Sequence, residues 1–213
     1  MKTDELVTAL ASQVGAVDRN LPARQIAAAS LVGITAALLI VAWRLGVNPQ
    51  LESDARVPMF WVRAAFAALM VLAGVQLVSR LGRPGSAVRA AWGALALPLI
   101  AMWSLAVIVL LGAAADQRTA LVFGSTSRSC PWNIALMSLP ALGLMLAALR
   151  SLAPTHLRSA GAAAGALAGA LATLAYVLHC PELAAPFIAV WYVLGIAIPA
   201  AIGLAIGPLV LRW

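Results

Sequence analysis

Six long apolar runs, uncharged except for one arginine, constrain this chain more than any other feature. The runs cover residues 25–43, 58–78, 90–113, 131–149, 159–178 and 184–210. Each is close to the roughly 20 residues that an α-helix needs to cross a bilayer. None shows the alternating pattern of a membrane β-barrel strand. The sequence therefore predicts an all-α fold, a polytopic bundle of six transmembrane helices.

The composition excludes a water-soluble domain. Only 10% of the 213 residues are charged, against about 25% in soluble domains. The connections between the runs are too short for a second folded domain. We expect a tail at 1–24 and one membrane domain at 25–213. The exception among the runs is Arg63, one turn inside the second, which we expect to extend to the interface.

The distribution of positive charge predicts the orientation. An even number of spans puts both termini on one side, and that side carries more cations, a bias typical of the cytoplasmic face. The nine cations on this side are Lys2, Arg19, Arg24, Arg80, Arg83, Arg89, Arg150, Arg158 and Arg212, against Arg44, Arg56, Arg63, Arg118 and Arg128 opposite. Both termini are thus predicted to be cytoplasmic. The net charge of +7 then indicates contact with the headgroups of the lipid bilayer, and no direct binding of nucleic acid.

Two cysteines are the most distinctive candidates for function. Cys130 lies in Ser-Arg-Ser-Cys-Pro-Trp-Asn and Cys180 in Leu-His-Cys-Pro-Glu, both on the predicted outer side. Proline after each suggests a cysteine that caps the start of a helix, where the thiolate is favoured. Arg128 and His179 are neighbouring groups that would support a thiolate.

Three interpretations of this pair stay open. The cysteines form a structural disulfide, they respond to an oxidant or a metal, or they are inert buried thiols. A soft-metal site from Cys130, Cys180 and His179, with support from Glu182, is chemically reasonable. The sequence contains no CxxC, HExxH, GxSxG or P-loop motif, so we expect neither an enzyme nor a cofactor.

The tail has the pattern of a short amphipathic helix. Thr3 can cap it, with Asp4 and Glu5 in the first turn. The apolar face consists of Leu6, Leu10 and Val14, widened by Val7. The tail is neutral overall, whereas a helix that lies on anionic lipid would be cationic. We predict that it binds a groove on a protein partner. The alternative is packing on the bundle or on the lipid surface.

Small residues follow one face of the fifth run. Gly161, Gly165 and Gly169 recur at every fourth position, which lets another helix approach closely. Packing within the bundle is the first interpretation, and a homodimer through this face is the alternative.

With these residues in view, the chain resembles the negative regulator of sigma F family of membrane anti-sigma factors. The resemblance spans nearly the whole sequence. It rests on the opening Met-Lys-Thr-Asp-Glu-Leu, on 124–134 around Cys130, on His-Cys-Pro-Glu at 179–182, and on 185–213. It implies a bacterial inner-membrane protein that sequesters an extracytoplasmic-function sigma factor. It also implies release under heavy-metal or oxidative stress through Cys130 and Cys180.

A small transporter or a metal-efflux accessory with outer metal-binding thiols is the alternative function. Transporters usually carry charged or polar residues within their spans. Here the interiors of the spans hold only isolated polar residues such as Gln76, Ser104 and Asn133, which favours the regulator.

Overall fold

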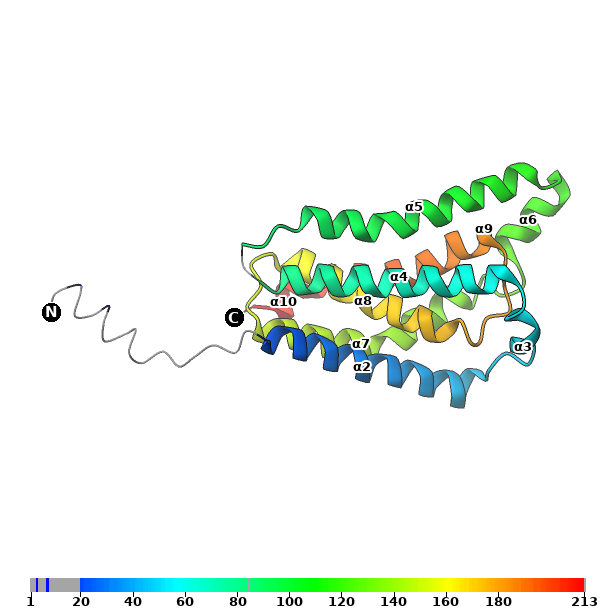
Figure 1. The fold of residues 1–213 in the computed structure, drawn as a ribbon. Coiled ribbons are helices and arrows are strands. Elements are labelled where there is room, and N and C mark those ends of the chain that lie inside the picture. Colours follow the sequence, from blue (N-terminus) through cyan, green and yellow to red (C-terminus); the bar gives the residue numbers. More distant parts are fainter. Residues whose placement is uncertain (1–2, 4–6, 8–19, 84, 213) are drawn as a thin grey trace.

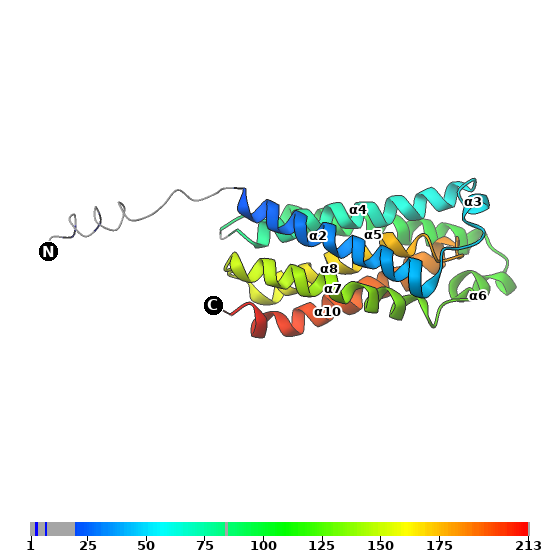
Figure 2. The same cartoon turned by 90° about the horizontal axis from the view of Figure 1, so that it is seen from below.

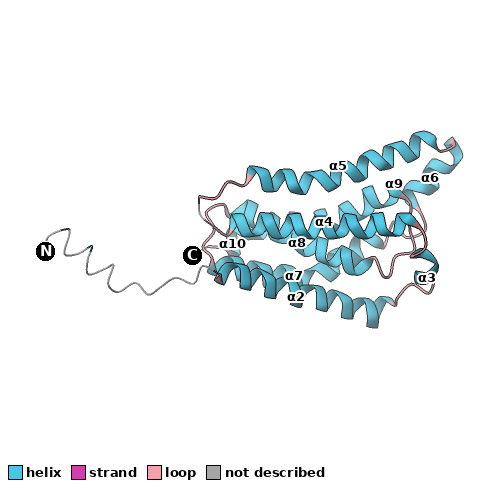
Figure 3. Cartoon of the chain, in the orientation of Figure 1, coloured by secondary structure: helices cyan, strands magenta, loops and turns pink. Residues whose placement is uncertain are grey.

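The computed structural model describes residues 3, 7, 20–83 and 85–212. In this part the regular elements are all helical, and Figure 3 shows them joined by loops. They are α2 (Leu21–Ile40), η1 (Val41–Leu45), α3 (Leu51–Asp54), α4 (Pro58–Leu81), α5 (Arg89–Gly112), α6 (Ala115–Phe123), α7 (Cys130–Ser151), α8 (Leu157–Tyr176), α9 (Ala185–Phe187), η2 (Ile188–Tyr192) and α10 (Val193–Val210). The elements η1 and η2 are single π-helical turns.

Six helical segments are long and apolar enough to cross a membrane. They are Leu21–Leu45, Pro58–Leu81, Arg89–Gly112, Cys130–Ser151, Leu157–Tyr176 and Ala185–Val210. The predicted all-α fold is confirmed. The ends differ from the predicted ones by a few residues, because hydropathy does not register the polar turns that begin or end a helix.

The predicted tail helix lies almost entirely outside the described residues. Asp4, Glu5, Leu6, Leu10 and Val14 are among the residues not described. Val7 is described, is helical, and leaves 59% of its surface exposed. The partner-binding face of the tail therefore stays a prediction.

The helices run up and down between two ends of the bundle (Figures 1 and 2). One end, here the terminal end, holds the start of α2, the end of α10 and the loops 82–88 and 152–156. The other, here the cysteine end, holds α3, α6 and the loop 177–184. Helix α5 lies at the outside of the bundle (Figure 1) and rests mainly on α4 and α9.

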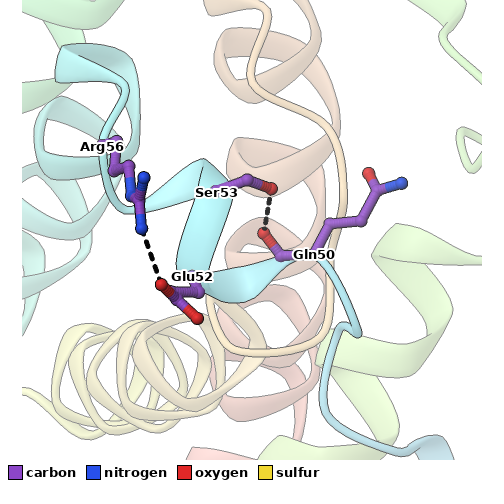
Figure 4. A network of polar contacts seen from close by, with 4 residues as sticks. All are labelled: Gln50, Glu52, Ser53 and Arg56. Atoms are coloured by element: carbon purple, nitrogen blue, oxygen red, sulfur yellow. Dashed lines mark hydrogen bonds and ion pairs between the residues drawn. The ribbon is translucent and has the colours of Figure 1, made fainter.

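Two short helices at the cysteine end were not predicted. In α3, the carboxylate of Glu52 accepts a hydrogen bond from Arg56 at 2.7 Å, and Ser53 donates to the carbonyl of Gln50 at 2.7 Å (Figure 4). Helix α6 is too short and too polar to be recognised in the sequence as a transmembrane helix. Both contain charged residues that mark the connections in the sequence.

Helix α8 is the centre of the bundle and contacts α2, α4, α7 and α10. Its glycine face packs directly on α10. The carbonyl oxygens of Gly203 and Pro199 occupy the places where side chains at Gly161 and Gly165 would stand. Packing within the bundle is thus confirmed. The alternative prediction, a homodimer through Gly161, Gly165 and Gly169, does not fit this structure, because α10 already covers this face.

Replacing Gly165 with alanine is expected to destabilise the protein by about 1–3 kcal/mol, as overpacking does. The new methyl group would overlap backbone atoms of Pro199 and Ala200, which cannot move as a side chain can. The thermal midpoint in detergent measures the effect. Gly143→Ala is the matched control, because nothing lies within 4 Å of the position of its Cβ. Equal midpoints for the two variants would contradict this packing.

Candidate functional site

The two cysteines meet at the cysteine end of the bundle. Cys130 is the first residue of α7, and Cys180 lies in the loop after α8. Both are fully buried and not joined by a disulfide, and they lie close enough for each thiol to affect the ionisation of the other. The structure thus brings together two side chains that the sequence could not place relative to each other.

The expected helix-capping role holds for neither cysteine. Cys130 lies one position inside α7, after Ser129. The prediction for Cys180 is wrong, because the chain continues without helical structure through 181–184 before α9 begins at Ala185. A negative charge on the Cys180 sulfur would therefore have to be stabilised by groups other than the start of a helix.

Arg63 supplies the positive charge at this site. The expectation that it extends to the membrane interface is wrong, because its exposure is 0%. Its guanidinium donates to the carbonyls of Val177, Cys180 and Glu182 at 3.1, 2.8 and 2.7 Å. It also lies over the ring of Phe60, 5.2 Å from the centroid. A buried charge needs such partners, and the carbonyls of the loop 177–182 provide them.

The other loops of the cysteine end are bonded to the same segment, Val177–Glu182, here called the thiol segment. The backbone N–H of Asn48 donates to the carbonyl oxygen of Leu178 at 2.9 Å. The carboxylate of Glu182 accepts from the amide and the hydroxyl of Ser125, each at 2.7 Å. The other two interhelical loops of this end, which carry Asn48 and Ser125, are therefore both fastened to the segment that carries Cys180.

The predicted supporting residues have other roles in this structure. Arg128 is exposed at the surface. His179 places Nδ1 2.8 Å from the carbonyl oxygen of Gly46, and its ring lies beside that of Tyr176. Glu182 fastens the loop to Ser125. Within the described part of the chain, no group of three or more His, Cys, Asp or Glu side chains could hold a metal ion, so the predicted site with His179 does not form here.

Two tyrosines complete the site and were missed in the sequence. Tyr176 on α8 accepts a hydrogen bond from Asn133 at 3.4 Å. Tyr192, at the end of η2, is fully buried and its hydroxyl has no hydrogen-bond partner of normal geometry. They are the only tyrosines of the chain. This rarity is the one feature of the sequence that could have drawn attention to them. Their rings are 6.1 Å apart.

The surroundings of Cys180 favour its ionised form. The neighbouring thiol of Cys130 is the main cause, followed by the backbone of Glu182, the side chain of Tyr192 and the charge of Arg63. Together they outweigh the effect of burial and lower the pKa of the Cys180 thiol below its ordinary value. A thiolate is the reactive form of cysteine, both as a nucleophile and as a metal ligand. The site can therefore present one activated sulfur beside a second thiol.

Comparison with known proteins identifies close relatives. A family model described as "Negative regulator of sigma F" matches residues 10–213. The chain is 43% identical over 213 residues, all of both chains, to a "Probable anti-sigma-F factor NrsF" of Azospira oryzae. It is 38% identical, again over the whole of both chains, to the "Anti-sigma-F factor NrsF" of Caulobacter vibrioides. No solved structure matches the chain.

Proposed function

This chain belongs to the negative regulator of sigma F family, and from that premise we propose that it sequesters an extracytoplasmic-function sigma factor at the bacterial inner membrane. Release follows when Cys130 and Cys180 react with an oxidant or a heavy metal outside. The observation that carries the sensing half is the buried thiol pair with its guanidinium, at the end of the bundle opposite the terminal end.

The orientation follows from charge. The loops of the terminal end carry Arg80, Arg83 and Arg89 in one connection and Arg150 and Arg158 in the other. Such an excess of arginine is typical of cytoplasmic loops. The cysteine end would then lie in the periplasm, an oxidising compartment in which thiol chemistry can report on the environment.

The tail is the proposed binding element. It is the longest segment outside the six spans on the cytoplasmic side, and its apolar face of Leu6, Leu10 and Val14, with Val7, suits a groove on a protein. Asp4 and Glu5 fall in the first turn of the predicted helix, where acidic side chains are favoured. Val7 is exposed, which leaves it free to contact a partner.

The transporter alternative has less support. Away from the cysteine end, the fully buried polar side chains of the described part are Ser138 and Thr173. Each hydroxyl donates to a carbonyl of its own helix, that of Ala135 or Gly169. In the described part, these residues supply no polar path across the bundle such as solute transport requires.

Co-purification with the sigma factor tests the binding half. Membranes are solubilised in detergent, and the full chain is compared with a variant that lacks residues 1–17. We expect the full chain to retain the sigma factor and the truncated chain to lose it, because the deletion removes the whole apolar face. Quadruple replacement of Leu6, Val7, Leu10 and Val14 by serine is the matched control at constant length.

Retention by the truncated chain would move the contact to cytoplasmic loops such as 82–88. Retention by neither chain would contradict the anti-sigma function. In that case, solute flux in vesicles would be the measurement for the transporter.

A further inference from the structure

We propose that a groove between η1 and the start of α7, here called the Arg44 groove, binds one anionic phospholipid of the phosphatidylglycerol type. Arg44 binds the phosphate, Asn133 accepts a hydrogen bond from a headgroup hydroxyl, and an acyl chain follows the apolar wall. This inference goes beyond the proposed function, because it involves neither the sigma factor nor the reaction of the thiols.

The Arg44 groove lies at the cysteine end of the bundle, where the first span ends and the fourth begins (Figure 1). Its volume is about 460 Å³, and its lining residues are Ile40, Arg44, Leu45, Asn133, Leu136 and Met137. Ligand sites in proteins have volumes of roughly 300–1,000 Å³. The lining contains one cation and no acidic side chain, so the groove favours a ligand that is partly apolar and carries negative charge.

Arg44 has no partner in the described part of the chain. Its side chain is exposed and makes no hydrogen bond or ion pair with any described residue. It lies in the π-helical turn η1, whose end is fixed by the N–H of Gly46, which donates to the carbonyl of Val41 at 2.7 Å. Such turns are frequent at functional sites. A guanidinium at the edge of an apolar groove, with all its donors available, is suited to a phosphate group.

The polar and apolar residues of the groove are separated by depth. Arg44 is the next-to-last residue of the first span, and Asn133 is the fourth residue of the fourth span. Ile40 and Met137 each lie four residues further into these spans, which is about 6 Å deeper at the rise of an α-helix. A phospholipid has the same order, with a polar headgroup above apolar chains.

Two exposed tryptophans mark the level of the headgroups. Trp43 precedes Arg44, Trp132 precedes Asn133, and their exposed fractions are 84% and 62%. Tryptophan is enriched where the lipid chains meet the headgroups. The two polar residues of the groove therefore lie where a lipid phosphate would be.

Asn133 distinguishes between phospholipid headgroups. Its amide nitrogen donates to the hydroxyl of Tyr176 at 3.4 Å, which leaves the side-chain oxygen as an acceptor. A glycerol headgroup has hydroxyl groups that can donate to this oxygen, whereas a choline headgroup has no such donor. An ethanolamine headgroup could donate, but Arg44 repels its positive charge. The combination of Arg44 and Asn133 thus favours phosphatidylglycerol.

A second groove on the apolar surface shows what the Arg44 groove has in addition. It lies along α5, has a larger volume of about 580 Å³, and is lined by Leu99, Ile100, Trp103, Ser104, Val107 and Ile108. No charged residue is among them. Acyl chains can fill this groove with any headgroup attached, so we expect no selectivity for anionic lipid there.

Native mass spectrometry of the full-length protein in detergent tests the proposal. The protein is titrated with phosphatidylglycerol or with phosphatidylcholine of the same acyl chains, and we expect one phosphatidylglycerol to be retained in preference. Arg44→Gln should weaken this binding at least about ten-fold, as the loss of a hydrogen bond to a charged group would. Arg44→Lys should recover part of the affinity, because an ammonium still attracts phosphate.

Arg128→Gln is the matched control, because Arg128 is an exposed arginine at the same end that does not line the Arg44 groove. It should leave the affinity within about two-fold, since distant exposed charges are screened by salt. Equal weakening by Arg44→Gln and Arg128→Gln would mean a general effect of charge and would overturn the inference. The thermal midpoint of Arg44→Gln without lipid should equal that of the parent protein, because Arg44 has no partner to lose.

The role of Asn133 is tested with two lipids. Asn133→Leu should weaken binding of phosphatidylglycerol about five-fold, as the loss of one hydrogen bond would. It should leave binding of phosphatidic acid unchanged, because this lipid has the phosphate without the glycerol hydroxyl groups. A merely structural role of Asn133 would weaken both lipids equally, and that result would contradict the assignment.

Two further outcomes would replace the lipid with another occupant. Displacement of phosphatidylglycerol by millimolar glycerol phosphate would show that a soluble phosphate compound suffices, and it would overturn the inference. A lipid-free dimer that Arg44→Gln dissociates would place a second copy of the chain in the groove, with the same consequence. Failure of displacement and a monomer with one bound lipid are the results expected. Because no sigma factor is present, these results neither support nor weaken the proposed function.

Discussion

Replacing Arg63 with leucine is expected to be the most destabilising single change in the described part of the bundle, by about 3–5 kcal/mol, as is typical when one partner of a buried charged network is lost. The substitution leaves the carbonyls of Val177, Cys180 and Glu182 without their donor. Each buried carbonyl without a partner costs about 1–3 kcal/mol. For a chain of this size the thermal midpoint should fall by roughly 10 °C.

Arg56→Leu is the matched control, since it is an arginine at the same end of the bundle. Its ion pair with Glu52 is exposed, with 78% of the Arg56 side chain accessible, and such pairs contribute little. We expect its midpoint to stay within about 2 °C of that of the parent protein, because surface substitutions change stability little. Arg63→Lys should fall between the two, because an ammonium keeps the charge but loses the planar geometry that serves three carbonyls. A midpoint for Arg63→Leu no lower than that of the control would contradict the role of Arg63 as the link between α4 and the thiol segment.

The fold could be predicted from the sequence to a large extent because the bilayer leaves few choices. Spans of uncharged residues must be helices, since their backbone groups have no other partners in lipid. The glycine face of α8 was recognised for the same reason, as close approach of helices is what small residues allow. The sequence could not give the π-helical turns or α6, because these depend on packing at the ends of the bundle.

The candidate site was predictable in its residue types but not in its geometry. The two Cys-Pro motifs pointed to Cys130 and Cys180, and the structure brings them together. Arg63 was misjudged because its position one turn inside a span fits both an interfacial and a buried side chain. Only the fold of the loop 177–182 supplies the carbonyls that make burial favourable. Tyr192 was missed because a tyrosine near a cysteine in space leaves no sequence pattern.

The position of Cys130 and Cys180 determines how a reaction there could act at a distance. Cys130 begins α7 and Cys180 follows α8, and these two helices pack on each other, on α2 and on α10. A disulfide requires Cβ atoms about 3.8 Å apart and a defined torsion about the S–S bond, so it fixes the start of α7 against the thiol segment. Arg63 also holds that segment to α4, and this is the route by which we expect the change to reach Arg80 at the terminal end.

The double variant Cys130→Ser, Cys180→Ser is therefore expected to retain the sigma factor after oxidation, while the parent protein loses it. To move a bound fraction from 99% to 1%, oxidation must supply about 5.5 kcal/mol of differential affinity, and a disulfide can contribute 2–4 kcal/mol. Release in the parent should therefore be substantial but incomplete. Co-purification before and after peroxide measures it. Binding by the untreated double variant shows that it is folded, and recovery of binding by the parent after reduction shows that the change is in the thiols. Equal loss of the sigma factor from the double variant and the parent would place the sensor outside the thiol pair.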